Sequence, residues 1–270
     1  CSMPILRLAA LASLLCALAA PVSAQTTFYV DSAQGSDAND GLSLESARST
    51  IASAVASAGA GDVILVNQGS YTEAVAINGK PNLTLRGVGA TIVGPSGAHI
   101  IRITDSPGLK LSGFHLRGVG TPAAVFLLAT VIQAAPVELS NLRISDCENG
   151  IFADTPNVRA VIRDTFVHDG TVGIVIRAGQ FVIQHTTLAF LSDAGVTSDG
   201  GAQVAIKNSL FYRNGTAIRT FASNRSFNAY FGNLTPVPAE PGLLLVDPLI
   251  HDEAGRVFLL KAASPLAGAA

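Results

Sequence analysis

The chain has 270 residues, 49% of them hydrophobic and 13% charged, with 17 Lys and Arg against 19 Asp and Glu. This composition excludes a disordered chain and is sufficient for a large hydrophobic core. It offers no basic stretch of the kind that nucleic-acid-binding proteins use, so nucleic acid is not an expected partner.

Residues 1–24 are predicted to be a secretory signal peptide with Met3 as the initiator. Arg7 supplies the positive charge, residues 8–20 form an apolar run too short to span a bilayer, and residues 22–24 resemble a cleavage site. A lipoprotein signal built on Cys16 is the alternative, although Leu15 is bulky for such a site. We therefore expect a periplasmic or extracellular protein without a membrane span.

The mature domain, residues 25–270, is expected to begin with a cap over residues 28–80. Residues 28–30 form a short β-prone run, and a polar loop follows over residues 31–41. Residues 46–58 predict a helix, because Ile51 and Val55 lie on one face and Gly59 follows as a stop signal. Such a helix would cover the open apolar end of a stacked structure.

A repeat follows the cap: an apolar anchor residue and, two positions later, a small or polar residue. The anchors are separated by 26, 28, 23, 21 and 23 residues. They are Leu85, Leu111, Leu139, Ile162, Ile183 and Ile206. A repeat of this length with short β-prone runs predicts a β-solenoid. In the coil that begins at Val158 we expect three strands, over residues 160–162, 165–167 and 173–176, in parallel sheets with apolar inner faces.

One column of the repeat carries polar residues two positions after the anchor. It contains Asn141, Asp164, His185 and Asn208. Asn and Asp tolerate tight bends and hydrogen-bond their own backbone, so this column is interpreted as bend-forming. Asp164 and His185 are therefore not expected to act as a catalytic dyad.

Several short motifs resemble those of secreted bacterial right-handed parallel β-helix proteins, a group that includes the pectate-lyase-like polysaccharide lyases. They lie at residues 29–31, 35–37, 39–41, 61–62 and 69–71, and near the C-terminus at residues 246–249 and 264–265. The resemblance covers about residues 28–265. It implies an all-β fold: a single-stranded right-handed parallel β-helix (solenoid) with a short N-terminal capping helix and a C-terminal cap over residues 232–270. The matched residues are cap and turn positions, so no catalytic residue is carried over.

An enzyme of this fold would work on one outer face, where a turn and the strand after it meet. The turn contains Asp146, Glu148, His168, Asp169, Asp193 and Arg213, and the strand contains Phe152, Arg177, Asp199 and Arg219. Coils stack about 4.8 Å apart, so equivalent positions approach each other. The alternative is that these are ordinary solvated turn residues.

Cleavage of a uronate by β-elimination needs a neutralising cation and a base. Asp146, Asp169 and Asp193 are the candidate ligands for Ca²⁺. Arg177, Arg219 or His168 is the candidate base. A hydrolase would instead use two carboxylates, for which Asp169 and Asp193 are the candidate pair.

Aromatic residues gather between positions 211 and 231. They are Phe211, Tyr212, Phe221, Phe227, Tyr230 and Phe231. Tyr212 and Phe152 are candidates to bind sugar rings, with Arg213 beside them. The alternative, that the aromatic group caps the C-terminal end, is favoured.

These features predict a monomeric protein that acts on or binds polysaccharide. A polysaccharide-lyase-like enzyme on acidic glycans is the leading hypothesis. A non-catalytic surface or glycan-binding solenoid is the alternative, because stacked coils offer a long, repetitive binding face.

Overall fold

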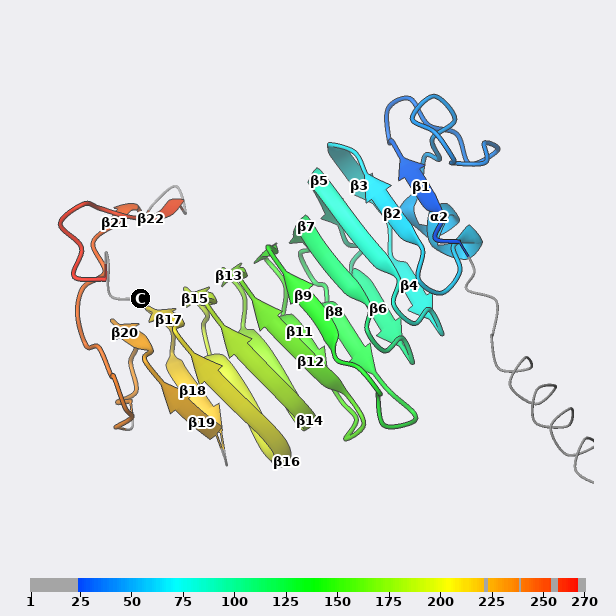
Figure 1. The fold of residues 1–270 in the computed structure, drawn as a ribbon. Coiled ribbons are helices and arrows are strands. Elements are labelled where there is room, and N and C mark those ends of the chain that lie inside the picture. Colours follow the sequence, from blue (N-terminus) through cyan, green and yellow to red (C-terminus); the bar gives the residue numbers. More distant parts are fainter. Residues whose placement is uncertain (1–23, 221–222, 238, 254–256, 267–270) are drawn as a thin grey trace, which may run out of the picture.

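The computed structural model shows a right-handed parallel β-helix of about seven coils (Figure 1). It describes residues 24–220, 223–237, 239–253 and 257–266. Residues 1–23 of the predicted signal peptide lie outside the described residues. Phe221, one of the aromatic residues noted in the sequence, also lies outside them. Within the described part of the chain, helices are too short or too polar to cross a membrane. The fold class predicted from the sequence is confirmed.

Each coil contributes strands to three sides of the solenoid, which we name faces A, B and C. Parallel pairing joins successive coils within each face, and long strands that run through a corner link the faces into one 20-stranded sheet. Face A contains β1 (Thr27–Val30), β2 (Val63–Val66), the first part of β5 (Thr84–Val93) and of β7 (Lys110–Arg117), β9 (Val137–Ser140), β12 (Arg159–Arg163), the second part of β14 (Val172–Gln184) and of β16 (Ala194–Lys207), and β19 (Ser223–Ser226).

The other two faces follow in each coil. Face B contains β3 (Gly69–Thr72), the second part of β5 and of β7, β10 (Arg143–Ser145), β13 (Phe166–His168), β15 (Thr187–Ala189), β17 (Leu210–Tyr212) and β20 (Ala229–Phe231). Face C contains β4 (Val75–Asn78), β6 (Ile101–Thr104), β8 (Ala123–Leu128), β11 (Asn149–Ala153), the first part of β14 and of β16, and β18 (Thr216–Thr220).

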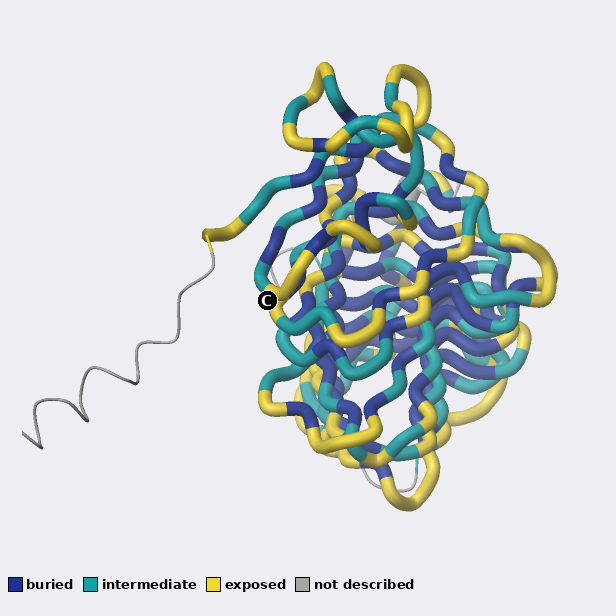
Figure 2. The backbone as a smooth tube through the Cα atoms, turned by 90° about the vertical axis from the view of Figure 1, so that its right-hand side faces the viewer, coloured by how far each residue is buried: buried dark blue, intermediate teal, exposed yellow. Residues whose placement is uncertain are grey.

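The anchors of the sequence repeat form one buried column inside face A. All six are 0% exposed and pair in register from coil to coil. Viewed along the solenoid in Figure 2, buried positions line the interior and exposed ones lie at the corners. Burying each such side chain stabilises the fold by about 1.5–3 kcal/mol, so stacking of like residues is the main source of stability.

Left-handed backbone conformations form two corners of the solenoid. Asn141, Asp164, His185 and Asn208 have φ of 51°, 51°, 50° and 48°, which confirms that their column is bend-forming. A second column, at the corner between faces B and C, contains Asp146, Asp169, Phe190 and Arg213, with φ of 60°, 54°, 54° and 52°. Asn and Asp adopt this conformation more readily than other L-residues, which explains their frequency at these corners.

Secondary structure differs from the sequence prediction at two points. The helix, α2 (Ile51–Ser57), is shorter than the predicted 46–58 because Thr50 caps it and the Glu73 carboxylate accepts hydrogen bonds from the N–H groups of Ile51 and Ala52, both at 2.9 Å. Strands β14 and β16 run through the corner from face C to face A, where separate strands were expected. The region predicted as the N-terminal cap, residues 28–80, also contains the first complete coil, which β2, β3 and β4 form.

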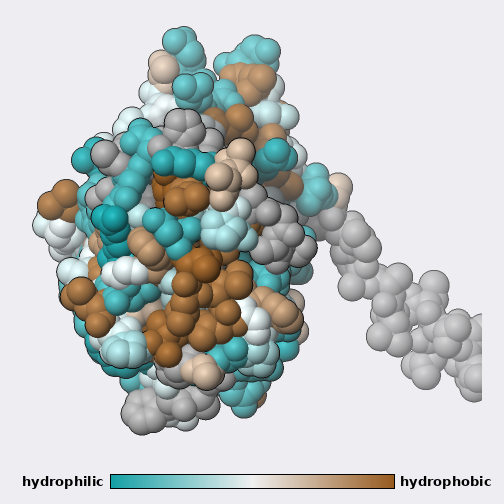
Figure 3. Space-filling view, turned by 90° about the vertical axis from the view of Figure 1, so that its left-hand side faces the viewer, coloured by the Kyte–Doolittle hydropathy of each residue, from teal (hydrophilic) through white to brown (hydrophobic). Residues whose placement is uncertain are grey.

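The C-terminal segment closes the other end. Val237 and Leu243 pack against the core there, and Leu244 forms a bridge with Ala229 of the last coil. The hairpin of β21 (Ile250–Asp252) and β22 (Val257–Leu260) follows, and Ile250 packs on the outer side of face B with Ala189 and Tyr212. Phe211 and Tyr230 belong to the main core, in the inward column of face B, with their rings stacked 5.1 Å apart. The last coils therefore bury these two aromatic residues, in place of the expected role as an end cap. Figure 3 looks onto this end and shows apolar surface gathered near its centre.

Candidate functional site

An open groove of about 560 Å³ runs over the outer side of face C. It crosses β11, β14, β16 and β18, so each coil contributes one or more side chains. The lining residues are Glu148, Asn149, Phe152, Val172, Val175, Arg177, Asp193, Thr197, Ser198, Asp199, Arg219 and Thr220. We name it the face C groove. Of the predicted site residues, it brings together Phe152, Arg177, Asp193 and Arg219.

Strand register explains why these residues share the groove. Phe152, Val175, Thr197 and Arg219 occupy the same outward position in successive coils. A column of glycines precedes them, because a Cβ at Gly150, Gly173 or Gly195 would lie 2.5 to 2.6 Å from a carbonyl oxygen of the next coil. This close approach fixes the start of the face C strands in β11, β14 and β16, and therefore the position of their groove side chains.

Arg177 is held in place by a carboxylate and an aromatic ring. Its Nη1 lies 3.1 Å from Asp154 Oδ1, and its guanidinium carbon lies 5.0 Å from the centre of the Phe152 ring. Phe152 in turn stacks on Phe126 at 5.4 Å, and Phe126 stacks on His99 at 4.3 Å. Because these neighbours occupy the ring faces, Phe152 positions Arg177 rather than offering a flat platform for a sugar.

Arg219 and Asp193 form the second fixed pair. The two guanidinium Nη atoms lie 2.6 and 3.3 Å from the two carboxylate oxygens, a bidentate arrangement. The hydrogen bonds to Asp193 raise the pKa of Arg219 above its ordinary value. Arg219 is therefore a stable cation that can bind a ligand oxygen, and it is poorly suited to accept a proton.

Two further carboxylates in the groove are unpaired. Glu148 and Asp199 make no side-chain hydrogen bond or ion pair with any described residue. The groove lining therefore contains three carboxylates, Glu148, Asp193 and Asp199, against two guanidinium groups. Its balance of charge is negative, which disfavours direct binding of a polyanion.

The remaining predicted carboxylates lie at the corner between faces B and C, outside this groove. Asp146 pairs with Arg117 at 2.9 Å, and Asp169 accepts a hydrogen bond from His168 Nδ1 at 2.8 Å. His168 is 4% exposed, and its Nε2 accepts a hydrogen bond from Arg143. This bonding pattern fixes the neutral tautomer with the proton on Nδ1.

The structure separates Asp193 from Asp146 and Asp169. In register, Ser145, His168 and Ala189 pair, so Phe190 continues the column of Asp146 and Asp169. Across the described residues, no group of three or more His, Cys, Asp or Glu side chains converges on a possible metal position. The three predicted Ca²⁺ ligands therefore do not fit a common site.

Tyr212 and Arg213 also lie away from the groove. Tyr212 is 2% exposed and its hydroxyl donates a hydrogen bond to Glu253. Burial, together with Glu253, raises the pKa of Tyr212 to about 12. Arg213 pairs with the same Glu253 carboxylate, so both residues hold the C-terminal segment.

A histidine on face B gives the protein a predicted dependence on pH. Burial, and then the charge of Arg143, lowers the pKa of His115 from 6.5 to about 4. Unfolded His115 binds a proton between these values and folded His115 does not, so stability falls as pH drops from about 6.5 to about 4. We expect a loss of about 1 kcal/mol, discounted for partial exposure. Thermal unfolding of His115→Gln should show a flatter pH dependence; an unchanged slope would contradict this assignment.

Sequence reasoning missed Asp154 and Phe126. Asp154 occupies the position in its coil that Arg177 and Asp199 occupy in the next two coils, so its place in the repeat was a usable signal. Phe126 lies in a long apolar stretch without charges, residues 121–136, which contains none of the repeat anchors. Asp154 affects the groove by holding Arg177, and Phe126 affects it by stacking on Phe152.

Neither a protein-family model nor a curated protein sequence matches this chain. Solved structures with some similarity include an alginate lyase from a Paenibacillus species, at 15% identity over 71% of this chain and 86% of that one, with a TM-score of 0.46. Others are a lacto-N-biosidase from Eubacterium ramulus, at 12% identity over 77% and 59% (TM-score 0.48), and a pectate lyase, at 13% over 91% and 92% (TM-score 0.43). Similarity at this level assigns no activity.

Proposed function

We propose that the face C groove binds a polysaccharide chain. The observation that carries this proposal is the presence of two fixed guanidinium–carboxylate pairs, Arg177 with Asp154 and Arg219 with Asp193, on neighbouring coils of one open groove. Asn149, Thr197 and Thr220 also line the groove. Sugar hydroxyl groups both donate and accept hydrogen bonds, so they match a surface that presents fixed donors and acceptors.

The charge of the groove favours a neutral glycan. Three carboxylates against two guanidinium groups oppose the entry of a uronate polymer. The lyase hypothesis also needs a base, and Arg219 holds its proton more firmly than an ordinary arginine. For these reasons we place binding of a neutral glycan ahead of β-elimination on an acidic one.

A second function, glycoside hydrolysis, is favoured by Glu148 and Asp199. These are the groove carboxylates that no described side chain neutralises. In hydrolysis, one carboxyl group protonates the glycosidic oxygen and the other activates water or attacks the sugar. Both residues lie in the same groove as the proposed binding pairs.

Two assays on a panel of neutral and acidic polysaccharides separate these functions. Hydrolysis releases new reducing ends, whereas β-elimination releases unsaturated products that absorb ultraviolet light. If Glu148 and Asp199 are catalytic, Glu148→Gln and Asp199→Asn should each lower the rate about a hundredfold or more. Asp164→Asn, at a different corner, is the matched control. Unsaturated products from polyuronates would instead restore the lyase hypothesis, and binding without cleavage would leave a glycan-binding solenoid.

A further inference from the structure

Face A is basic, although the chain as a whole has more acidic than basic residues. Among its described outward residues, five are cationic and one, Glu138, is acidic. The cationic residues are Arg86, Lys110, Arg159, Arg163 and Lys207. They lie far apart in the sequence, and the stacking of coils collects them on one side of the solenoid.

Most of this positive charge is uncompensated. Arg86, Lys110 and Lys207 form no ion pair with a described carboxylate, whereas Arg163 lies 3.7 Å from Glu138 and 3.6 Å from Asp164. Exposed cations spread along one side create a positive potential that attracts polyanions. The face C groove has the opposite balance, so the two sides differ in the ligands they favour.

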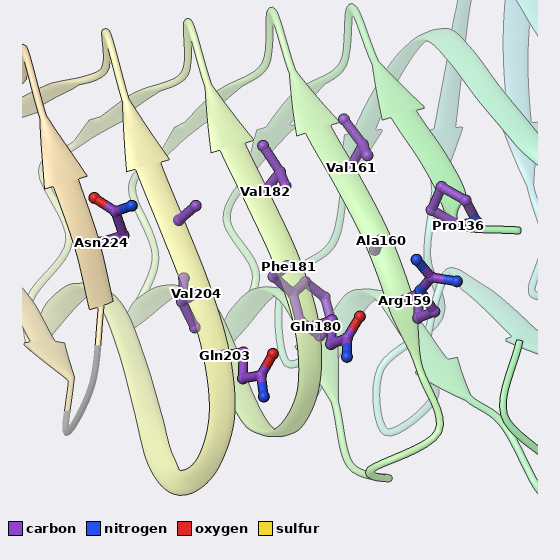
Figure 4. Close-up of a pocket in the computed structure, with 11 residues that line it drawn as sticks. Pro136, Arg159, Ala160, Val161, Gln180, Phe181, Val182, Gln203, Val204 and Asn224 are labelled. Carbon is purple, nitrogen blue, oxygen red and sulfur yellow. The ribbon is translucent and has the colours of Figure 1, made fainter.

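A shallow trough of about 350 Å³ lies on face A; Arg159 lines it, and the other four cations lie elsewhere on the same face. Val161, Val182 and Ala205 occupy one outward position in successive coils and give it an apolar floor. Figure 4 shows Gln180 and Gln203 on neighbouring coils, with Arg159 toward one end and Asn224 toward the other. The two glutamine amides make no hydrogen bond with described residues, so their donors and acceptors are available.

We propose that face A binds an acidic polysaccharide that lies along the solenoid axis. The C–H faces of its sugar rings pack on Val161 and Val182, its hydroxyl groups bond to Gln180 and Gln203, and its carboxylates meet the surrounding cations. Coils repeat about every 4.8 Å, so each coil offers a new set of contacts to an extended chain. This inference is independent of the glycan proposed for the face C groove.

Two other occupants fit these residues less well. Single-stranded nucleic acids stack their bases on aromatic rings, but Phe181, the aromatic residue that lines the trough, is 2% exposed. A second copy of the chain would place one basic face against another, which is repulsive. An acidic glycan uses the apolar floor, the amides and the charge together.

Binding of polygalacturonate at low ionic strength tests the proposal. We expect Lys110→Gln/Lys207→Gln to bind about tenfold more weakly, because each exposed charge contact contributes a factor of a few. The charge-matched control Arg102→Gln/Lys261→Gln removes two exposed cations elsewhere and should change affinity less than twofold. Gln180→Ala/Gln203→Ala should weaken binding several-fold and leave its salt dependence unchanged, since no charge is lost.

Three results would overturn the proposal. The first is no binding of polygalacturonate by the wild-type protein. The second is equal weakening in the control variant, which would show a general charge effect. The third is binding of duplex DNA as tight as that of polygalacturonate, with no effect of the glutamine substitutions. The face C groove is tested separately, through the products of cleavage and through substitutions at other residues, so a failure of the face A proposal is distinguishable from a failure of the proposed function.

Discussion

We expect Glu240→Ala to lower the free energy of unfolding by about 3 kcal/mol, because it breaks a buried network at the C-terminal end of the solenoid. The side chain of Glu240 is 2% exposed. Its carboxylate accepts hydrogen bonds from the Asn228 side chain and from the Tyr230 hydroxyl, both at 2.8 Å, and from the Asn228 backbone N–H at 3.2 Å. Arg225 lies 3.9 Å away.

Removal of the carboxylate leaves these donors buried without an acceptor, which costs more than the loss of the bonds alone. Asn228 also ties the last coils together, since its side chain bonds to the backbone of Ser209 and Ile206. Thermal unfolding measures the effect, with Tyr230→Phe as a milder comparison of about 1 kcal/mol. Limited proteolysis should cut the C-terminal segment of Glu240→Ala first, because coils at the end of a solenoid have one neighbour. Wild-type stability in this variant would refute the role of Glu240.

The double variant Arg177→Gln/Arg219→Gln should lose about a hundredfold in affinity for the glycan that the wild-type protein binds most tightly in the face C groove. Each guanidinium group offers charge-assisted hydrogen bonds worth about 1.5–3 kcal/mol, and the two lie in the same groove. Both ion pairs are exposed, so their loss should change stability little. Calorimetric titration measures the affinity, and thermal unfolding checks that the variant remains folded.

Arg102→Gln is the matched control for this variant. Arg102 lies in the same outward column as Phe126 and Phe152 but does not line the groove. The Arg102→Gln variant should therefore bind the glycan with the affinity of the wild-type protein. If the double variant and the control bind equally well, the two guanidinium–carboxylate pairs are not the binding determinant and the proposed function is wrong.

The fold was predictable because the signal repeats. The anchors Leu85 to Ile206 recur at each coil, and a buried column in register satisfies all of them at once. The helix start was less predictable because it depends on a distant residue, Glu73, whose carboxylate bonds to the first N–H groups of α2. Such a contact leaves no mark in the local hydrophobic pattern.

The candidate site was predictable only in part, because its columns depend on turn length. Three residues separate faces B and C after Ser145 and after His168, but four do so after Ala189. The additional residue carries Asp193 out of the column of Asp146 and Asp169 and toward Arg219. The sequence shows that this turn is longer, but it does not show which turn residue falls outside the column of Asp146 and Asp169.

The basic character of face A was hidden for a related reason. Arg86, Lys110 and Lys207 are isolated in the sequence, and no basic run precedes or follows them. Their common face becomes evident only when the register of the coils is known. A nearly balanced overall charge therefore concealed two surfaces of opposite sign.

Oxidative footprinting of side chains tests the central claim, that the face C groove binds polysaccharide, most directly. Phe152 reports on the groove, Val182 on face A, and the 62% exposed Phe227 on neither. With a saturating neutral oligosaccharide, we predict that oxidation of Phe152 falls several-fold while that of Val182 and Phe227 is unchanged. Unchanged oxidation of Phe152, or protection confined to Val182, would place the glycan elsewhere and contradict the proposed function.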